Sequence, residues 1–458
     1  MNESIKLKKG DKVTLISLYP DLRNLSLRPI STYLKEKGIK NQIIFLMKNF
    51  YEEDDEEDLK SLIKLCKGSK IVGITLMSYF FKRAVVITKR LKEELNCKVV
   101  WGGIYPLMCP EKCLKYADEI CIGDGETFLA GEKGQLENID IMPDLDFSTQ
   151  FVLKEGKIIN VTEEMFSRSC RGIYNIFTSR GCIYNCTFCV YNKLRKINPR
   201  VRVRSIENVM QELLYVKKHL PSFKKVSFTD ENICSLDANH LRNLFKQYKE
   251  KIRMPFFVSV HPTLVNEEKV KIFADSGVEI VRIGVQTGSD DIRRVFNRFE
   301  KDNEIINAVR LFKKYNIKIE LDFITDNPYE KKKDILNSLR LIRKLAPFEL
   351  HLFSLTFYEG TKIYEMAERD NLLRGRTTLK TAVKYTYLNS LYLFLSRHKV
   401  SENTFNFLLN TKLSFFFKHI FFAEHKLNMY AKSFKPEMLL DFNTYKRAYY
   451  LWKKNYMR

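Results

Sequence analysis

Three cysteines lie close together in the sequence and have the spacing of metal ligands. Cys182, Cys186 and Cys189 follow the pattern C-x3-C-x2-C within the segment SRGCIYNCTFCVY. A strand is predicted directly before them, so they lie in a loop, where three thiols can converge on one point. A helix would spread them around its axis. Because thiolates select zinc, copper(I) or iron–sulfur clusters, the spacing predicts a metal site in this loop.

The number of cysteines bears on the kind of metal site. A structural zinc ion needs four protein ligands, and a fully ligated four-iron cluster needs four cysteines. The nearest further candidates, Cys170 and His219, are not close in the sequence. Three cysteines would leave one iron of such a cluster with an open position for a substrate or cofactor. The pattern therefore favours an open iron–sulfur cluster over a zinc knuckle or three free thiols.

Strands and helices alternate around and after the cysteines. Each strand is a short apolar run, and each helix has apolar residues at helical spacing. About six such units are too few for a closed eight-fold barrel, so we expect a partial (β/α)6 barrel, open on one side, with its chemistry at the carboxyl ends of the strands. The predicted strands are 174–179, 225–228, 256–259, 280–284, 318–324 and 350–355, and the predicted helices are 206–219, 237–249, 266–276, 290–296, 303–315 and 332–345.

A second alternation precedes the cysteines. It predicts a parallel, doubly wound sheet with helices on both faces. Ligands of such sheets bind beyond the carboxyl ends of the strands, where this chain has several glycines that also suit tight turns. The predicted strands are 12–18, 42–46, 70–77, 98–101 and 119–122, and the predicted helices are 25–37, 59–66 and 82–95.

These patterns divide an α/β chain into four parts. Residues 1–140 form the doubly wound domain, 141–167 a linker with a small hairpin at 151–161, 168–370 the partial barrel, and 371–458 a helical C-terminal subdomain.

The predicted C-terminal subdomain has sixteen Lys and Arg residues against four acids and carries much of the net charge of +23. Such charge attracts nucleic acid, phosphorylated metabolites or acidic lipid. The aromatic residues of this part have helical spacing, which favours packing over stacking on bases, so binding of nucleic acid or a membrane surface is not favoured.

The cysteine segment resembles the radical S-adenosylmethionine (radical SAM) superfamily, and the resemblance extends over residues 170–370. In that superfamily, three cysteines hold a 4Fe–4S cluster whose open iron binds the amino and carboxylate groups of SAM. SAM is then cleaved to a 5′-deoxyadenosyl radical. The resemblance implies that Cys182, Cys186 and Cys189 bind this cluster, and it identifies no catalytic acid or base.

Further residues match the positions at which the superfamily contacts SAM. Two departures stand out: Gln286 replaces the Glu of many relatives, and Glu359-Gly-Thr361 replaces a usual Pro-Gly-Thr. The glycine that usually follows the fifth barrel strand is also missing. The SAM contacts implied by the resemblance are Phe188, Asp230, Glu231, Asn232, Gln286, Ser289, Arg298 and Asp322.

The order of the domains resembles the class of the superfamily that has an N-terminal cobalamin-binding domain. The segments WGG at 101–103 and YADEICIGDGE at 116–126 match that class. Many cobalamin proteins provide a lower-ligand histidine in an Asp-x-His-x-x-Gly motif, but the corresponding loop here is DLRNLS, and no histidine precedes His219. Histidine ligation from this domain is therefore excluded. The cobalamin contacts implied by the resemblance are Thr75, Met77, Ser78, Gly102, Gly103, Gly123 and Glu126.

The resemblance implies an oxygen-sensitive enzyme that uses a 4Fe–4S cluster, SAM and cobalamin to transfer a methyl group to an unactivated carbon of an unknown substrate. Oxidative cyclisation, or another C–H activation without methyl transfer, uses the same domain order and stays open. A four-cysteine electron-transfer protein would not need so large a scaffold. A methylthiotransferase is less favoured, because that family has a second three-cysteine set that the N-terminal cysteines do not form. Those cysteines are Cys66, Cys97, Cys109, Cys113 and Cys121.

Two expectations concern the surroundings of the protein. A radical SAM enzyme needs a reducing partner, such as flavodoxin or ferredoxin. The sequence shows neither the apolar core of a signal peptide nor an apolar run long enough for a membrane span, so we expect a cytoplasmic location.

Overall fold

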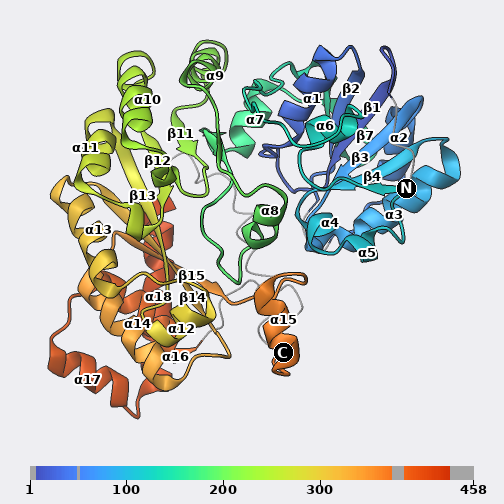
Figure 1. The fold of residues 1–458 in the computed structure, drawn as a ribbon. Coiled ribbons are helices and arrows are strands. Elements are labelled where there is room, and N and C mark those ends of the chain that lie inside the picture. Colours follow the sequence, from blue (N-terminus) through green and yellow to red (C-terminus); the bar gives the residue numbers. More distant parts are fainter. Residues whose placement is uncertain (1–6, 49–51, 374–385, 434–458) are drawn as a thin grey trace. The chain divides into compact units, whose positions relative to one another are not determined.

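The computed structural model describes residues 7–48, 52–373 and 386–433, with side chains up to residue 425. It divides into two compact units: the first contains the residues up to 341 together with 347–383, and the second contains 342–346 and the residues from 384 on. Within the predicted C-terminal subdomain, residues 374–385 and 434–458 lie outside the described residues. Two sheets and the helices that follow their strands (Figure 1) confirm the α/β class.

The N-terminal sheet has seven strands in the order β5-β4-β3-β1-β2-β6-β7. Strands β1 to β5 are parallel, and their order is that of flavodoxin-like sheets, in which ligands bind where the loops after β1 and β3 diverge. The bounds are β1 (Lys12–Ser17), β2 (Lys40–Phe45), β3 (Ser69–Thr75), β4 (Lys98–Gly102) and β5 (Glu119–Ile120), with α1 (Leu27–Glu36), α2 (Glu56–Cys66), η1 (Ser78–Phe80), α3 (Phe81–Glu94), α4 (Ile104–Met108), α5 (Pro110–Cys113) and α6 (Gly125–Leu129).

The central strands of this sheet are apolar along their whole length. Nearly all residues of β1, β2 and β3 are buried, as expected for a parallel sheet that is covered on both faces. The fully buried Trp101 of β4 donates a hydrogen bond from Nε1 to Oγ1 of Thr88 at 2.8 Å. Continuous apolar runs therefore predicted these strands to within a few residues.

The hairpin at 151–161 exists, but its assignment to a linker was wrong. Strand β6 (Gln150–Lys154) pairs in parallel with β2, and β7 (Lys157–Asn160) pairs antiparallel with β6. The hairpin thus extends the N-terminal sheet, because the edge of β2 offers backbone groups that need partners. Gly156, with φ of +74°, forms its turn, and its N–H donates to Asp58 at 2.7 Å.

The second sheet is the predicted partial barrel. Its six strands are parallel neighbours in the order β15-β14-β13-β12-β11-β8. The strands are β8 (Ile173–Ile176), β11 (Lys225–Phe228), β12 (Phe256–Val260), β13 (Val278–Gln286), β14 (Lys318–Thr325) and β15 (Glu349–Ser354). The helices are α7 (Glu163–Ser169), α9 (Ile206–His219), α10 (Ala238–Lys251), α11 (Glu267–Ser276), α12 (Asp290–Val295), α13 (Asp302–Lys314), α14 (Lys332–Leu345) and α15 (Lys362–Arg369), with the short η2 (Phe147–Thr149), η3 (Ile233–Ser235) and η4 (Pro262–Leu264).

The cysteine loop has a scaffold of its own. The two-residue strands β9 (Ser179–Arg180) and β10 (Arg202–Val203) pair antiparallel and bring the two ends of segment 181–201 together. Helix α8 (Tyr191–Ile197) lies within that segment. Neither the ribbon nor α8 was predicted, because both are shorter than the patterns that periodicity detects.

The second unit contains α16 (Tyr387–Arg397), α17 (Glu402–Asn410) and α18 (Ser414–Ser433). Helix α17 ends at Asn410 and α18 begins at Ser414, so these two segments form separate helices. Phe421 is buried and stacks on Phe394 with a centroid distance of 4.1 Å. Among the described residues, none of the helices combines the length and the apolar character needed to cross a bilayer.

Candidate active site

The cysteine loop lies between β9 and β10. Cys186 is buried, and Cys182 and Cys189 are half-buried. Gly181, with φ of +115°, begins the loop, and a Cβ at this position would lie 3.1 Å from the carbonyl oxygen of Arg200 at the other end. Only glycine suits so close an approach of two backbone segments with a positive φ.

Backbone hydrogen bonds fix the middle of the loop to the barrel. The N–H of Thr187 donates to the carbonyl of Phe296 at 3.0 Å, and the N–H of Ile363 donates to the carbonyl of Thr187 at 3.0 Å. Phe188 packs edge-on against Phe296 with a centroid distance of 5.0 Å. Phe188 therefore anchors the loop beside α12 and is well placed to line the region of the third cysteine.

The three thiols are close enough to affect one another electrostatically. Burial raises the pKa of all three, that of Cys189 to about 11. Nη1 of Arg298 lies 4.0 Å from Sγ of Cys186, and its charge works against the effect of burial. A metal that replaces the protons would remove the cost of forming buried thiolates.

Within the described part of the chain, no three His, Cys, Asp or Glu side chains gather around one point as ligands of a single metal ion. A four-iron cluster makes a different demand, because each cysteine binds an iron of its own. Three thiols spaced along one loop fit that arrangement, with Arg298 beside one of them. The donor set thus suits a cluster better than a zinc ion.

The two carboxylates that follow β11, those of Asp230 and Glu231, differ in how many of their hydrogen bonds are made within the protein. Asp230 is fully engaged: it accepts hydrogen bonds from Oγ1 of Thr178 at 2.8 Å and from Oγ of Ser179 at 2.5 Å. Glu231 accepts a hydrogen bond from the hydroxyl of Tyr191, while its buried Oε2 has no hydrogen-bond partner among the described residues. Of these two acids, only Glu231 presents a free polar atom to a ligand.

Asn232 and His261 belong to a buried polar group near the loop. Oδ1 of Asn232 accepts from the N–H of His261 at 3.1 Å, while Nδ2 of Asn232 and Nε2 of His261 lack hydrogen-bond partners in the described structure. The His261 ring stacks on Tyr184 at 3.8 Å, and burial, together with the charge of Arg298, lowers its pKa to about 2. A neutral imidazole is therefore placed within this group. Sequence reasoning missed His261, because nothing local links it to the cysteines.

The end of β13 is strained at a predicted SAM contact. Gln286 has φ of +69°, in the left-handed region that is costly for a residue with a Cβ. The register between β13 and β14 shifts between Gly284 and Gln286, which marks a bulge. A Cβ on Gly284 would lie 2.8 Å from Nε2 of Gln286, so the glutamine side chain lies close over this glycine. Strain of this kind collects at functional sites.

The remaining predicted SAM contacts differ in whether their polar atoms already have partners within the protein. Oγ of Ser289 donates to Asp334 at 2.5 Å, so this hydroxyl already has a structural partner. Arg298 pairs with Glu300 at 2.6 Å. Asp322 lies 3.8 Å from Nε of Arg282, and its buried Oδ1 has no hydrogen-bond partner among the residues described. Asp322 thus keeps a carboxylate oxygen available for a ligand, whereas the Ser289 hydroxyl already donates its hydrogen and can only accept from a ligand.

Two predicted cobalamin contacts, Gly123 and Glu126, also take part in contacts within the protein. Glu126 is bound by Arg180 at 2.7 Å, and Asp124 by Arg202 at 2.5 Å. Gly123 has φ of +106°, a conformation that favours glycine, and the amide end of the Gln135 side chain packs against it. Through these ion pairs, Asp124 and Glu126 form a joint between the N-terminal domain and the cysteine loop, and the prediction that Gly123 and Glu126 contact a corrin stays a prediction.

The other predicted cobalamin contacts follow β3 and β4. Met77 and Ser78 are half-buried, and Gly103 is exposed. Thr75 is buried, and a Cβ on Gly103 would lie 2.8 Å from its Oγ1. These loops offer hydroxyl and backbone groups that suit the amide side chains of a corrin. They offer no imidazole, since the first histidine of the chain is His219.

The unusual Glu359 has a structural explanation. It forms an ion pair with Lys112 of α5 at 2.5 Å. The next residue, Gly360, has φ of +83°, and a Cβ there would lie 2.4 Å from the carbonyl oxygen of Met108. Proline in place of Glu359 could not make this ion pair, so the departure from the family pattern fixes the loop after β15 to the N-terminal domain.

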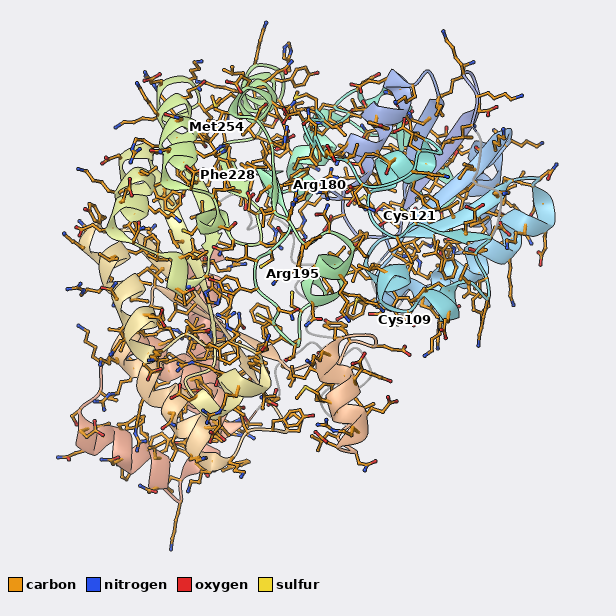
Figure 2. The ribbon with its side chains drawn as sticks, viewed as in Figure 1. Cys109, Cys121, Arg180, Arg195, Phe228 and Met254 are labelled. Atoms are coloured by element: carbon orange, nitrogen blue, oxygen red, sulfur yellow. The ribbon has the colours of Figure 1, made fainter. Side chains whose placement is uncertain are left out.

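A cavity of about 320 Å³ opens beside the cysteine loop. It contains Cys182, Glu231 and Tyr191, and two arginines that Figure 2 labels, Arg180 and Arg195, line it as well. Its size and its free carboxylate oxygen suit a small polar ligand.

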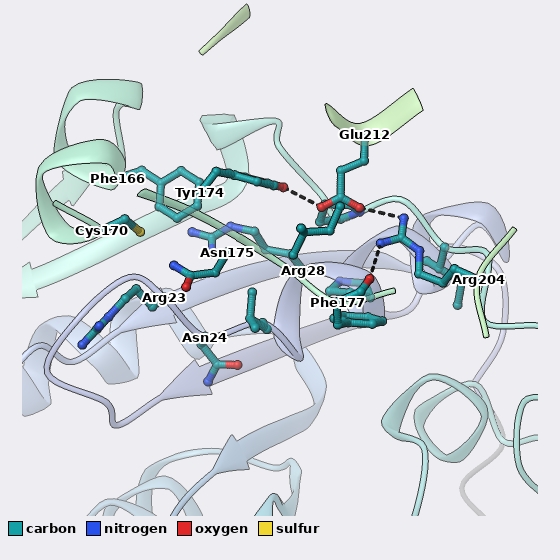
Figure 3. A pocket seen from close by; sticks show the side chains of 15 residues that line it. Arg23, Asn24, Arg28, Phe166, Cys170, Tyr174, Asn175, Phe177, Arg204 and Glu212 are labelled. Atoms are coloured by element: carbon teal, nitrogen blue, oxygen red, sulfur yellow. Dashed lines mark hydrogen bonds and ion pairs between the residues drawn. The ribbon is translucent and has the colours of Figure 1, made fainter. Parts of the chain in front are cut away.

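A second hollow, at Cys170, is different (Figure 3). It measures about 20 Å³, which is space for about one water molecule. Glu212 bridges Tyr174 at 2.8 Å and Arg204 at 2.7 Å within it. Cys170 therefore lies in a packed polar contact and not among the cysteines of the loop.

Comparisons with known proteins show which family and which folds this chain resembles. The model of the family described as the radical SAM superfamily matches residues 176–342. An uncharacterized methyltransferase of Pyrococcus horikoshii is 23% identical over 349 residues, which cover 70% of this chain and 75% of that protein.

Two solved structures share the fold. The radical SAM methyltransferase TsrM from Kitasatospora setae, with cobalamin and a [4Fe–4S] cluster bound, has a TM-score of 0.62 and 18% identity, covering 79% of this chain and 78% of that one. The cobalamin-dependent SAM radical enzyme OxsB has a TM-score of 0.56 and 19% identity, covering 81% and 57%. Both matches cover more than the barrel. Residues 176–342 form a radical SAM domain.

Proposed function

We propose that this protein is a cobalamin-dependent radical SAM methyltransferase that acts on an unactivated carbon. One observation carries the proposal: a sheet of flavodoxin-like order and a three-cysteine barrel are joined in one compact unit. The structure of TsrM, a methyltransferase with cobalamin and a cluster bound, has this fold over 79% of the chain.

The residues of the loop and the barrel have distinct tasks in this proposal. Cys182, Cys186 and Cys189 hold the cluster, and Arg298 stabilises the thiolate of Cys186. The free Oε2 of Glu231 is available to the amino group of SAM. When bound, the cluster and SAM supply a 5′-deoxyadenosyl radical that removes a hydrogen atom, and cobalamin supplies the methyl group.

The N-terminal domain binds cobalamin through the loops after β3 and β4, without an imidazole ligand. Thr75, Met77, Ser78, Gly102 and Gly103 are the residues assigned to this contact. The proposal includes a low-potential reductant such as flavodoxin or ferredoxin and a cytoplasmic location, which suits ten cysteines that form no disulfide.

The test is to purify the protein without oxygen, reconstitute iron and sulfide, add hydroxocobalamin, and measure corrin per chain after desalting. Retention near one corrin per chain is expected. A Thr75→Val, Ser78→Ala variant should retain less, whereas Thr162→Val, at the cap of α7, should not differ. Retention of iron without corrin would contradict the cobalamin part and turn the search toward C–H activation without methyl transfer.

A further inference from the structure

The segment that contains α8 carries more positive charge than its surroundings neutralise. Residues 192–204, NKLRKINPRVRVR, include six basic residues and no acid. Arg202 and Arg204 form ion pairs with carboxylates, and Nζ of Lys193 donates to a backbone carbonyl at 2.7 Å. Half of the positive charges in this segment thus have fixed structural partners.

The other three, Arg195, Lys196 and Arg200, have no carboxylate partner within the described part of the chain. Nη1 of Arg195 donates to the carbonyl of Ile183, which leaves the rest of its guanidinium without an ion pair. Clustered like charges of this kind repel one another unless an anion joins them.

Two of these three side chains line the cavity beside the cysteine loop. Arg195 and Arg200 contribute to its wall together with Cys182 and Glu231, whereas Lys196 does not. Arg195 and Cys182 line the same cavity, and Arg195 donates to the carbonyl of Ile183, the residue that follows Cys182. The guanidinium of Arg195 is thus near the position of the cluster, in a cavity with room for a ligand.

Guanidinium groups bind phosphates and carboxylates through paired hydrogen bonds. We propose that Arg195 and Arg200 bind an oxyanion, a phosphate, phosphonate or carboxylate group, of the molecule that enters this cavity. The inference rests on the proposed function and deepens it, because it assigns the substrate to an anionic class. The carboxylate of SAM has the same chemistry, but Arg298 already provides a separate cation beside Cys186.

The experiment uses the full chain with its cluster reconstituted. Iron content, corrin retained per chain and the electron paramagnetic resonance (EPR) signal of the reduced cluster are measured first, so a failure of the proposed function is seen before any arginine is tested. Inorganic pyrophosphate is then titrated, and its phosphorus NMR line width is followed with the cluster reduced and oxidised. Broadening specific to the paramagnetic reduced cluster reports binding near it. SAM binding is measured separately from its effect on the EPR signal.

The variants are Arg195→Gln, Arg200→Gln and the matched control Lys196→Gln, which removes the same charge from an exposed side chain of α8 outside the cavity wall. We expect Arg195→Gln to weaken pyrophosphate binding about tenfold or more and Arg200→Gln to weaken it less, with Lys196→Gln unchanged. Since Arg195 also binds the loop carbonyl of Ile183, the Arg200 variant keeps the test valid if Arg195→Gln loses iron.

The outcomes separate the sources of the anion. Loss of pyrophosphate binding with unchanged SAM affinity supports an anionic substrate. Weaker SAM binding in the arginine variants supports the oxyanion site with SAM as its source. Equal affinities for both ligands in the wild type and the arginine variants, or an equal loss in Lys196→Gln, would overturn the proposal.

Discussion

The carboxylate of Glu126 in the N-terminal domain lies 2.7 Å from the guanidinium of Arg180, which stands two residues before Cys182. Glu126 is only 2% exposed. Asp124, beside it, binds Arg180 at 3.2 Å and Arg202 at 2.5 Å. Because Arg180 and Arg202 lie on the paired strands β9 and β10, these acids hold both ends of the cysteine loop. The geometry of the loop therefore depends on the N-terminal domain.

Replacement of Glu126 by Gln should weaken this joint. The change removes the charge but keeps the size of the side chain, so it should cost about 1.5–3 kcal/mol of unfolding free energy and reduce the iron retained per chain. Denaturant unfolding and iron analysis measure the two effects. Glu111→Gln, an exposed acid of the same domain, is the matched control and should change neither. Full iron content together with wild-type stability in Glu126→Gln would show that the joint does not position the loop.

The pH dependence of the joint follows from Asp124. Burial raises its pKa, but the hydrogen bond and charge of Arg202 and the charge of Arg180 lower it more, so the net shift is below the ordinary 3.8. A carboxyl with a depressed folded pKa stabilises the protein above its unfolded pKa and loses that contribution as pH falls through the folded value. The stability difference between the wild type and Asp124→Asn should therefore be constant near neutral pH and shrink below about pH 4. Urea unfolding at a series of pH values checks this, and a difference that shrinks above pH 5 would contradict it.

Each of Cys182→Ala, Cys186→Ala and Cys189→Ala should abolish cluster assembly. Each of the three thiolates holds one iron, and the fourth iron already has no protein ligand. Iron and sulfide analysis and the visible absorption of the reconstituted protein are the measurements. Cys170→Ala is the matched control, since Cys170 lies in the small hollow with Arg28 and Phe166 and should be dispensable. Full iron in a loop variant would refute the assignment, and loss of the cluster in Cys170→Ala would indicate a fourth ligand.

Local patterns predicted most of the fold. Strand 225–228 and helices 206–219 and 332–345 have the predicted bounds, because each has a strong periodicity and clear breakers. The hairpin was recognised, but its pairing with β2 was not. Residues 43 and 150 are far apart in the chain, and local sequence does not encode which edge a strand joins.

The candidate site was predicted less completely. The cysteines were found from their spacing alone. The ion pair of Glu126 with Arg180 was not predicted, because the two residues are 54 positions apart and an ion pair over that distance leaves no local signal. His261 was missed for the same reason. Sequence thus identified the residue types that bind metal, while the supporting contacts required the fold.

The strain at Gln286 leads to a prediction that separates stability from function. With φ of +69°, Gln286 has a conformation that glycine adopts freely, so Gln286→Gly should stabilise the protein by about 1 kcal/mol. The same change removes the side chain that lies over Gly284 and should weaken the effect of SAM on the EPR signal of the reduced cluster. Arg253→Gly is the matched control: Arg253 has φ of +63° at the end of α10 and should give a similar gain in stability with unchanged SAM binding. A Gln286→Gly variant that is less stable than the wild type, or that binds SAM equally well, would show that the strained conformation does not serve the site.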